Sequence, residues 1–333
     1  MKRIACRELI GSSAAALRPL LEGAPYKPRR FLKDVPKERL CDCWQEEVAT
    51  ALASPVGRAF VAEVDGQLAG FSVLGDLAWE SAILGRKMAA VKHMAVRQGE
   101  EAARVSEALI RQGLQHARNG GYDFVLCKTY TDDAVTIHAL ERQGFLLMDT
   151  LLGFVFDLRK CPAAAQRVPV VPKGVELRIA GELDRAGLVE VAEGAFTAHF
   201  GRFHSDPRIG PEWGRTIYKR WIESCLDGWA DWIVLAETSG RIAGFTAWKK
   251  PSEGETLHQL GLGHYSIAAV HPDFIGRGLF SALSDQGVNL MRGLATRIEA
   301  PTHVNNYPIH QGLIQMGWRI EEAQYSFHKW LKD

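Results

Sequence analysis

The chain repeats itself, and this internal repeat constrains its fold more than any other feature of the sequence. The segment "AEVDGQLAGF" begins at Ala62, and "AETSGRIAGF" begins 174 positions later, at Ala236. Each segment predicts a β-hairpin, because two apolar runs flank a polar turn that contains Gly66 or Gly240. Self-similarity at a fixed offset indicates a duplicated domain.

The same offset continues toward the end of each half. "AAVKHMAV" ends at Val96 and "HYSIAAV" ends at Val270, while "LERQGF" and "LIQMGW" are 173 positions apart. Between the halves lies "KCPAAAQRVPVVPKG", whose prolines cannot continue a helix or a central strand. A chain of 333 residues is long enough for two cores. We therefore expect one domain over residues 1–159, a linker over 160–174 and a second domain over 175–333.

Each half predicts the same elements in the same order. A helical region comes first, over residues 43–52 in one half and over 183–193 and 213–225 in the other. The hairpin follows, and after it come a strand, an amphipathic helix (105–118 or 279–293), another strand (123–130 or 296–302), a short helix and a final strand. This order predicts an α/β fold of two tandem domains, each with a mixed, mostly antiparallel sheet flanked by helices.

Composition narrows the range of partners. The 40 Lys and Arg residues balance 39 Asp and Glu residues, so neither nucleic acid nor a membrane surface is an expected partner. The six cysteines are scattered, without zinc-ligand spacing, and no metal site is expected. No long apolar run follows the first charged residues, so we expect a cytoplasmic protein with free thiols that acts on a small molecule.

A glycine-containing turn in the second half has chemical meaning. "HPDFIGRGLFSAL" places Gly276 and Gly278 between an apolar strand and a helix, where free backbone N–H groups can hold a phosphate. An ordinary tight turn would explain the glycines equally well. The first half, however, carries Ala102 and Arg104 at the equivalent positions of "RQGEEAARVSEAL". The turn can thus be built without those glycines, which favours an anion-binding function in the second half only.

These residues resemble a known family. "SIAAVHPDFIGRGLFSAL" is similar to the acyl-CoA loop of the GNAT superfamily of N-acetyltransferases, and "NYPIHQGLIQMGW" is similar to a later segment of that family. The resemblance implies tandem GNAT-like domains and acetyl-CoA as co-substrate. It places the acyl-CoA contacts on two strand residues, six loop residues and one asparagine: Ala269, Val270, Ile275, Gly276, Arg277, Gly278, Leu279, Phe280 and Asn306.

Three positions depart from the family pattern. Ile275 stands where the family has Gln or Arg, and Phe280 stands where it has a small residue. Leu313 occupies the place of the tyrosine that commonly protonates the departing thiolate. The general acid is therefore left open by the resemblance.

A narrower resemblance covers most of the chain. "LAWESAILGRKMAAV", "LERQGFLLMDTLLGFVFDL" and "HFGRFHSDPRI" are similar to two-domain sugar N-acetyltransferases of the TDP-fucosamine acetyltransferase kind. The resemblance implies a degenerate first domain, which forms an acceptor wall or a homodimer surface, and a catalytic second one. It also implies an acceptor that is an amino sugar or a nucleotide-linked amino sugar. Two alternatives stay open: another small amine (as in mycothiol synthesis, or an amino acid or antibiotic), and a catalytically silent acyl-CoA-binding module.

Acyl transfer to an amine needs a proton acceptor and a proton donor. His264, six residues before Val270, is the expected base, and Ser266 on the same strand is expected to orient a water. Tyr307 and His310 are the candidate acids on the short helix that contains Leu313. The alternatives are a satisfied histidine at a strand end, a capping turn, a surface histidine, and protonation by solvent.

The acceptor side is expected in "AHFGRFHSDPRI". His199, Arg202 and His204 can bind anions and hydroxyls, and the guanidinium of Arg202 suits a nucleotide pyrophosphate. The alternative is an ion pair between Arg202 and Asp206 that fixes the loop.

Overall fold

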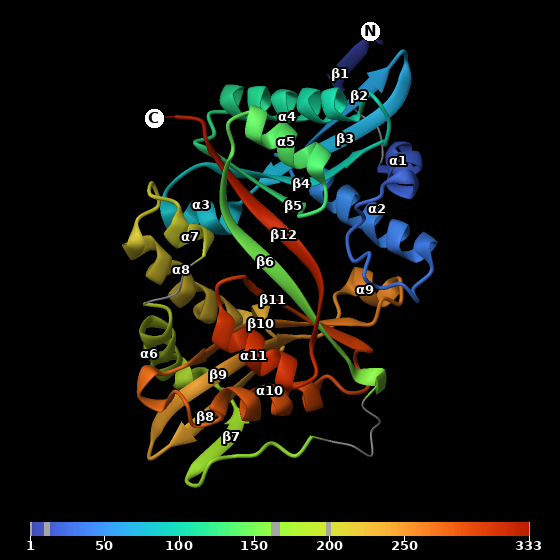
Figure 1. The fold of residues 1–333 in the computed structure, drawn as a ribbon. Helices are drawn as coiled ribbons and strands as arrows, with labels where there is room; N and C mark the ends of the chain where they lie inside the picture. Colours follow the sequence, from blue (N-terminus) through green and yellow to red (C-terminus); the bar gives the residue numbers. More distant parts are fainter. Residues whose placement is uncertain (1, 10–13, 161–166, 198–200, 333) are drawn as a thin grey trace. The chain divides into compact units, whose positions relative to one another are not determined.

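The computed structural model describes residues 2–9, 14–160, 167–197 and 201–332, which form two compact units (Figure 1). The first unit comprises Met1–Thr150, Leu257–Leu260 and Ala323–Asp333. The second unit comprises Leu151–Thr256 and Gly261–Glu322. These units differ from the expected domains 1–159 and 175–333 in the last strand of each half and in Leu257–Leu260, whose Leu260 packs with Leu32 and Leu40.

In the first unit the paired strands follow the order β1-β2-β3-β4-β5-β12, which is one half of a 12-stranded sheet. Helix α4 packs on this sheet through its apolar face, and Val105 and Leu109 are fully buried there. The strands that the first half contributes to this unit are β1 (Ile4–Glu8), β2 (Arg58–Val64), β3 (Gln67–Asp76), β4 (Met88–Val96) and β5 (Phe124–Tyr130). Its helices are α1 (Arg18–Gly23), α2 (Lys37–Ala53), α3 (Ala78–Leu84), α4 (Ala102–Asn119) and α5 (Ala134–Arg142).

The second unit repeats this plan with a sheet in the order β7-β8-β9-β10-β11-β6. Its own strands are β7 (Val175–Ile179), β8 (Trp232–Thr238), β9 (Arg241–Lys249), β10 (Leu262–Val270) and β11 (Arg297–His303). Its helices are α6 (Arg185–Ala195), α7 (Arg202–Ser205), α8 (Pro211–Ser224), α9 (Glu253–Leu257), α10 (Leu279–Leu290) and α11 (Tyr307–Gln315).

The last strand of each half completes the sheet of the other unit. Strand β6 (Leu146–Asp157) pairs with β11 from Leu151 onward, and its Phe154 and Phe156 are buried in the core of the second unit. Strand β12 (Arg319–Trp330) pairs with β5, and its Phe327 is buried in the core of the first unit. This exchange explains why the compact units do not follow the chain order.

The duplication seen in the sequence is present in the structure. Strands β4 and β10 begin 174 positions apart, and β5 and β11 begin 173 positions apart. Both β4 and β10 carry an irregularity at the same place, since Lys92 and Ser266 are each skipped in the pairing with the preceding strand. Within each unit the β4–β5 and β10–β11 pairs are parallel and the other described pairs are antiparallel, as a mixed, mostly antiparallel sheet requires.

The two faces of the second sheet carry different helices. Helices α10 and α11 cover one face, where Leu283, Leu313 and Ile298 share a core (Figure 1). Helices α6 and α8 cover the other face, where Leu188 and Ile222 pack against the sheet. Since successive strand residues point to opposite faces, each residue of β10 and β11 can be placed on one side or the other.

Candidate active site

Strands β10 and β11 separate part-way along their length. Their parallel pairing covers Leu262–His264 and Arg297–Glu299 and does not extend beyond these residues in the described chain. Strand β10 nevertheless stays paired with β9 as far as Val270. From Tyr265 onward, the backbone N–H and C=O groups on the side of β10 that faces β11 therefore lie outside the described ladder between these two strands. Such groups can hold the amides of an extended ligand.

The glycine turn lies just beyond this opening. A short 3₁₀ turn (Pro272–Phe274) follows β10, and Gly278 is the N-cap residue of α10. Gly276 and Gly278 have φ values of +79° and +78°, a region that L side chains rarely adopt, and nothing lies within 4 Å of a Cβ built on either. The turn is thus exposed and open, and it presents the first N–H groups of a twelve-residue helix to solvent.

The residues around these glycines are largely explained by packing. Phe280, which departs from the family pattern, is partly buried in the core beside α10, and a Cβ on Gly312 of α11 would come within 2.9 Å of its ring. Arg277 donates to the backbone carbonyl of Asp273 at 3.1 Å and lies over the Phe274 ring. Ile275 is 68 % exposed, and no contact in the structure explains it.

Three charged side chains meet where β10 and β11 begin to separate. Nε2 of His264 lies 2.8 Å from Oε2 of Glu255, and its Nδ1 lies 2.9 Å from Oε1 of Glu299. Glu255 comes from α9, where it also accepts a hydrogen bond from the backbone N–H of Ser252 in a reciprocal cap. Glu255 is 1 % exposed, whereas the side chain of Glu299 is 30 % exposed. Sequence reasoning named only His264 of these three.

The two carboxylates change the chemistry of His264. Burial by itself lowers the pKa of this imidazole, but the hydrogen bonds to Glu255 and Glu299 outweigh burial and raise the pKa to about 9. At neutral pH the ring is therefore protonated, and both nitrogens donate. An imidazolium has no lone pair that could accept a proton, so the base role of His264 stays a prediction that requires the ring to lose its proton first.

Ser266 has a partner that the sequence did not predict. The indole Nε1 of Trp221 on α8 donates to its Oγ at 3.2 Å. In the first unit, Trp44 of α2 donates in the same way to Nδ1 of His93 on β4. His93 is equivalent to Ile267, one residue beyond Ser266, so the two halves place an indole contact at neighbouring positions of the strand. The water-orienting role of Ser266 stays a prediction.

The structure brings the expected acid candidates together on α11. Nε2 of His310 donates to the backbone carbonyl of His303 at 2.8 Å, which fixes the ring, while Tyr307 is 62 % exposed and meets that ring edge to face. Leu313 is 1 % exposed and belongs to the core. Asn306 is the N-cap residue of α11, and its amide donates to Oγ1 of Thr302. None of these contacts tests the expected roles.

The predicted acceptor residues lie on the side of α8. His199 falls outside the described residues. The Arg202 guanidinium lies 3.8 Å from the centre of the Phe203 ring, and His204 stacks on Tyr218. Burial, together with nearby His303, lowers the pKa of His204. Sequence reasoning missed His303, although a Cβ on Gly201 would come within 2.5 Å of its Nε2 and only glycine allows that approach.

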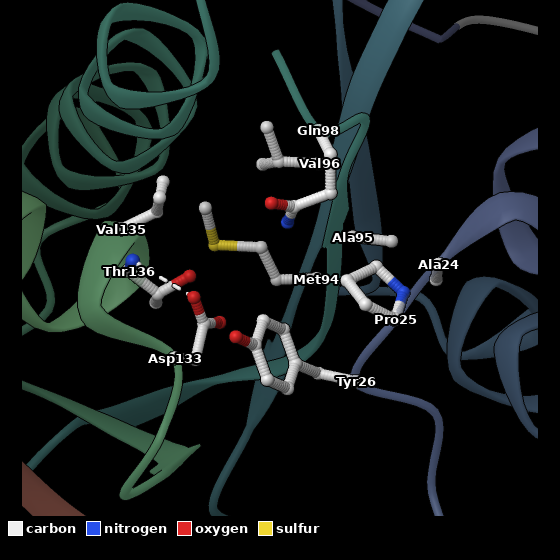
Figure 2. Close-up of a pocket in the computed structure, with 10 residues that line it drawn as sticks. All are labelled: Ala24, Pro25, Tyr26, Met94, Ala95, Val96, Gln98, Asp133, Val135 and Thr136. Atoms are coloured by element: carbon white, nitrogen blue, oxygen red, sulfur yellow. Dashed lines mark hydrogen bonds between the residues drawn. The ribbon is translucent and has the colours of Figure 1, made fainter.

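The first unit contains a counterpart of this opening (Figure 2). Strands β4 and β5 pair over Met88–Val91 and Phe124–Cys127, and a pocket follows beside Ala95 and Val96. These two residues are equivalent to Ala269 and Val270 of the second half.

The segment that follows α1 lines this pocket of the first unit. Pro25 and Tyr26 form one wall, and Figure 2 shows the Tyr26 ring beside Asp133, the N-cap residue of α5. The Tyr26 hydroxyl donates to the carbonyl of Asp132, and the Tyr130 hydroxyl donates to the carbonyl of Lys27. The pocket also carries a carboxylate where the second half has Asn306. The first unit therefore lacks the glycines of the turn and has an acidic side chain at the Asn306 position.

Among the described residues, neither a membrane-spanning helix nor a metal-binding cluster is found. No helix within the described residues is long and apolar enough to cross a bilayer. No group of three or more His, Cys, Asp or Glu side chains in the same residues is arranged to hold a metal ion.

Comparison with known proteins shows a match to one protein family. The sequence profile of the Acetyltransferase (GNAT) family matches residues 25–145. Residues 25–145 match the acetyltransferase (GNAT) family, and the chain resembles tandem GNAT proteins. The profile matches the half that lacks the glycine turn. The second half has the same strand order as the first, and it has a parallel strand pair at the equivalent place.

Relatives extend this likeness over the whole chain. The spore coat polysaccharide biosynthesis protein SpsD of Bacillus subtilis (strain 168) is 23% identical over 273 residues, which are 80% of this chain and 86% of that protein. A GCN5-related N-acetyltransferase from Sphaerobacter thermophilus has the same fold with a TM-score of 0.64, 16% identity, and coverage of 99% of this chain and 96% of that one. A tandem GNAT protein from the clavulanic acid biosynthesis pathway has a TM-score of 0.62 and 16% sequence identity, with 99% of both chains covered. The GNAT domain and the tandem fold indicate an N-acetyltransferase.

Proposed function

We propose that this chain transfers the acetyl group of acetyl-CoA to the amine of a small acceptor, an amino sugar or a nucleotide-linked amino sugar. The observation that carries the proposal is the open turn of Gly276 and Gly278 at the N-terminus of α10, beside the free edge of β10. The family generally uses acetyl-CoA, and these residues suit its two ends: N–H groups for the pyrophosphate and strand backbone for the pantetheine amides. We expect the reaction in the cytosol, by a monomer or a homodimer.

The chain's own groups have defined tasks in this reaction. The backbone of Ala269 and Val270 orients the thioester, and Arg277 and Asn306 lie at the two sides of the acyl-CoA path. His264 holds a proton at neutral pH and so acts as a fixed cation. Trp221 and the residues Arg202 and His204 line the acceptor side. The sugar acceptor is supported by the polysaccharide-related name of the Bacillus relative and by the narrower sequence resemblance.

A second candidate is a silent acyl-CoA-binding module. It is favoured by Leu313, which is buried in the core at the place where a thiolate-protonating tyrosine would stand. Solvent can protonate a thiolate as acidic as that of CoA, so the buried leucine does not exclude catalysis.

The test is thiol-detected release of CoA from acetyl-CoA, screened against amino sugars with and without a linked nucleotide. Release with amino sugars supports the proposed function, and Arg202→Ala is expected to slow only the nucleotide-linked acceptors. Release with amino acids or antibiotics alone would change the acceptor class. Tight acetyl-CoA binding without release from any amine would favour the silent module. Unchanged acetyl-CoA affinity in Gly276→Glu would show that the loop is assigned incorrectly.

A further inference from the structure

The cluster of Glu255, His264 and Glu299 is absent from the first half, although the surrounding scaffold is the same. At the fixed offsets of 174 and 173 positions, their counterparts are Ser81, Ala90 and Leu126. Strands β4 and β5 pair directly at Ala90 and Leu126, as β10 and β11 do at His264 and Glu299. The fold thus forms at this place with a small hydroxyl and two apolar side chains.

Placing these charges in the second half costs free energy. Transfer of a carboxylate or an imidazolium out of water is unfavourable unless it is paired and hydrogen-bonded. In the second half the hydrogen bonds among His264, Glu255 and Glu299 offset this cost. The first half shows that the topology does not require the cluster, because it forms with one hydroxyl and two apolar side chains. A polar cluster that the duplicate lacks is better explained by a ligand than by the topology.

The cluster is directed toward the acceptor side of the sheet. Ile298 and Ala300 point into the core beneath α10 and α11, so Glu299 between them points to the opposite face. Tyr265 belongs to the same core, so His264 likewise faces away from it. The opposite face is the one covered by α6 and α8, where Trp221 contacts Ser266 one residue beyond Tyr265.

The members of the cluster differ in what they can reach. Glu255 is 1 % exposed and is held by Ser252 and His264. Glu299 is 30 % exposed, and among the described residues His264 is the donor seen at its carboxylate, through Oε1. Its Oε2 is therefore available to a further donor. Two basic residues lie on the neighbouring strands: Lys249 at the end of β9, opposite His264, donates to the Trp229 carbonyl, and Arg297 lies two residues before Glu299 on β11.

We propose that Glu299 binds the ammonium group of the acceptor at the point where β10 and β11 separate, and that His264 and Glu255 are positioning residues that fix its carboxylate. This inference rests on the proposed function and names what the site selects: a primary amine that arrives as a cation, in preference to the hydroxyl of the parent sugar. An ammonium group supplies three donors, and a carboxylate oxygen is its natural partner. The carboxylate lies where β10 and β11 separate, beside the strand whose later residues Ala269 and Val270 orient the thioester. A bound ammonium has no lone pair, so it must first release one proton to solvent, after which the neutral nitrogen attacks the thioester carbonyl and the CoA thiolate leaves.

The test compares binding of matched ligand pairs to the CoA-saturated full-length chain. Calorimetry would use amino sugars with the amine at different ring positions, free and as nucleoside diphosphate conjugates, each paired with its parent hydroxyl sugar. We expect the wild type to prefer at least one amine, and Glu299→Gln to reduce that preference by about 10- to 100-fold, the range of a charge-assisted hydrogen bond. His264→Gln should reduce it by a smaller factor. Both variants should leave acetyl-CoA affinity unchanged.

A matched control removes a different carboxylate from the second unit. Glu237 is ion-paired with Arg178 and lies near the β8–β9 turn, about 20 Å along β9 from the residue that pairs with His264. Glu237→Gln should keep the amine preference. A preference that survives Glu299→Gln, or a wild type without any preference for amines, would overturn the inference. Turnover is read separately: amine binding that depends on Glu299 without CoA release would support the inference and contradict the proposed transferase.

Discussion

The ion-paired state of His264 makes a prediction about stability that can be measured without knowing the substrate. Its pKa rises from 6.5, the ordinary value for a histidine, to about 9 in the folded chain. A group whose folded pKa lies above its unfolded pKa stabilises the fold fully below the unfolded value, and this contribution is lost as the pH rises through the folded value. The relevant window therefore runs from about pH 6.5 to pH 9.

The magnitude follows from the size of the shift. At 1.36 kcal/mol per pKa unit, protonation of His264 contributes about 3 kcal/mol to the free energy of unfolding at pH 6. The same relation gives about 2 kcal/mol at pH 7.5 and roughly 0.2 kcal/mol at pH 9.5. The His264 side chain is 22 % exposed, so solvent screening reduces these values only partly.

The assay is urea unfolding followed by tryptophan fluorescence at pH 6, 7.5 and 9.5, for the wild type and His264→Gln. The difference between the two proteins should shrink as the pH rises. His93→Gln is the control. Burial lowers the pKa of His93 to about 4, so protonation of this ring below pH 6.5 destabilises the fold, which is the opposite of the effect at His264. A gap between wild type and His264→Gln that stays constant across this range would refute the ion-pair argument.

Three further predictions concern the glycines and the number of cofactor sites. Gly276→Ala and Gly278→Ala should each cost about 1 kcal/mol of stability and weaken acetyl-CoA binding in calorimetry, whereas Gly240→Ala, with φ +73° in an open hairpin turn, should cost the same stability and leave binding unchanged. Gly287→Ala should lower the melting temperature strongly, because its Cβ would lie 1.9 Å from the buried Trp248 ring, and a loss below about 1 kcal/mol would contradict this packing. Native mass spectrometry should find one acetyl-CoA per chain, and two equivalent sites would show that the first unit binds the cofactor without the glycines of the turn.

Much of the fold could be predicted because it depends on local pattern and on the repeat. The hairpins at Gly66 and Gly240 were confirmed, and both glycines have positive φ as such turns require. The helix after the glycine turn begins at Leu279, as expected. The exchange of β6 and β12 could not be predicted, because both strands carry similar apolar patterns and nothing local in the sequence selects between two equivalent sheet edges.

The candidate site was predicted less completely. Strand placement identified His264, but Glu255 and Glu299 look like ordinary surface acids when each is read alone. Their importance arises from a short helix and a neighbouring strand that converge only in the fold. A residue-by-residue comparison of the two halves would have flagged them, since Ser81 and Leu126 occupy the equivalent places.

The exchanged strands also govern the order in which the chain can be finished during synthesis. Domains generally fold from the N-terminus as they emerge, at about 5–20 residues per second. Strand β5 must instead wait for β12, which is translated roughly 10 to 40 s after β5 at that rate. During this interval an apolar edge, "FVLCKTY", lies open to pairing with other chains. The first sheet can therefore be completed only after most of the second half has been made.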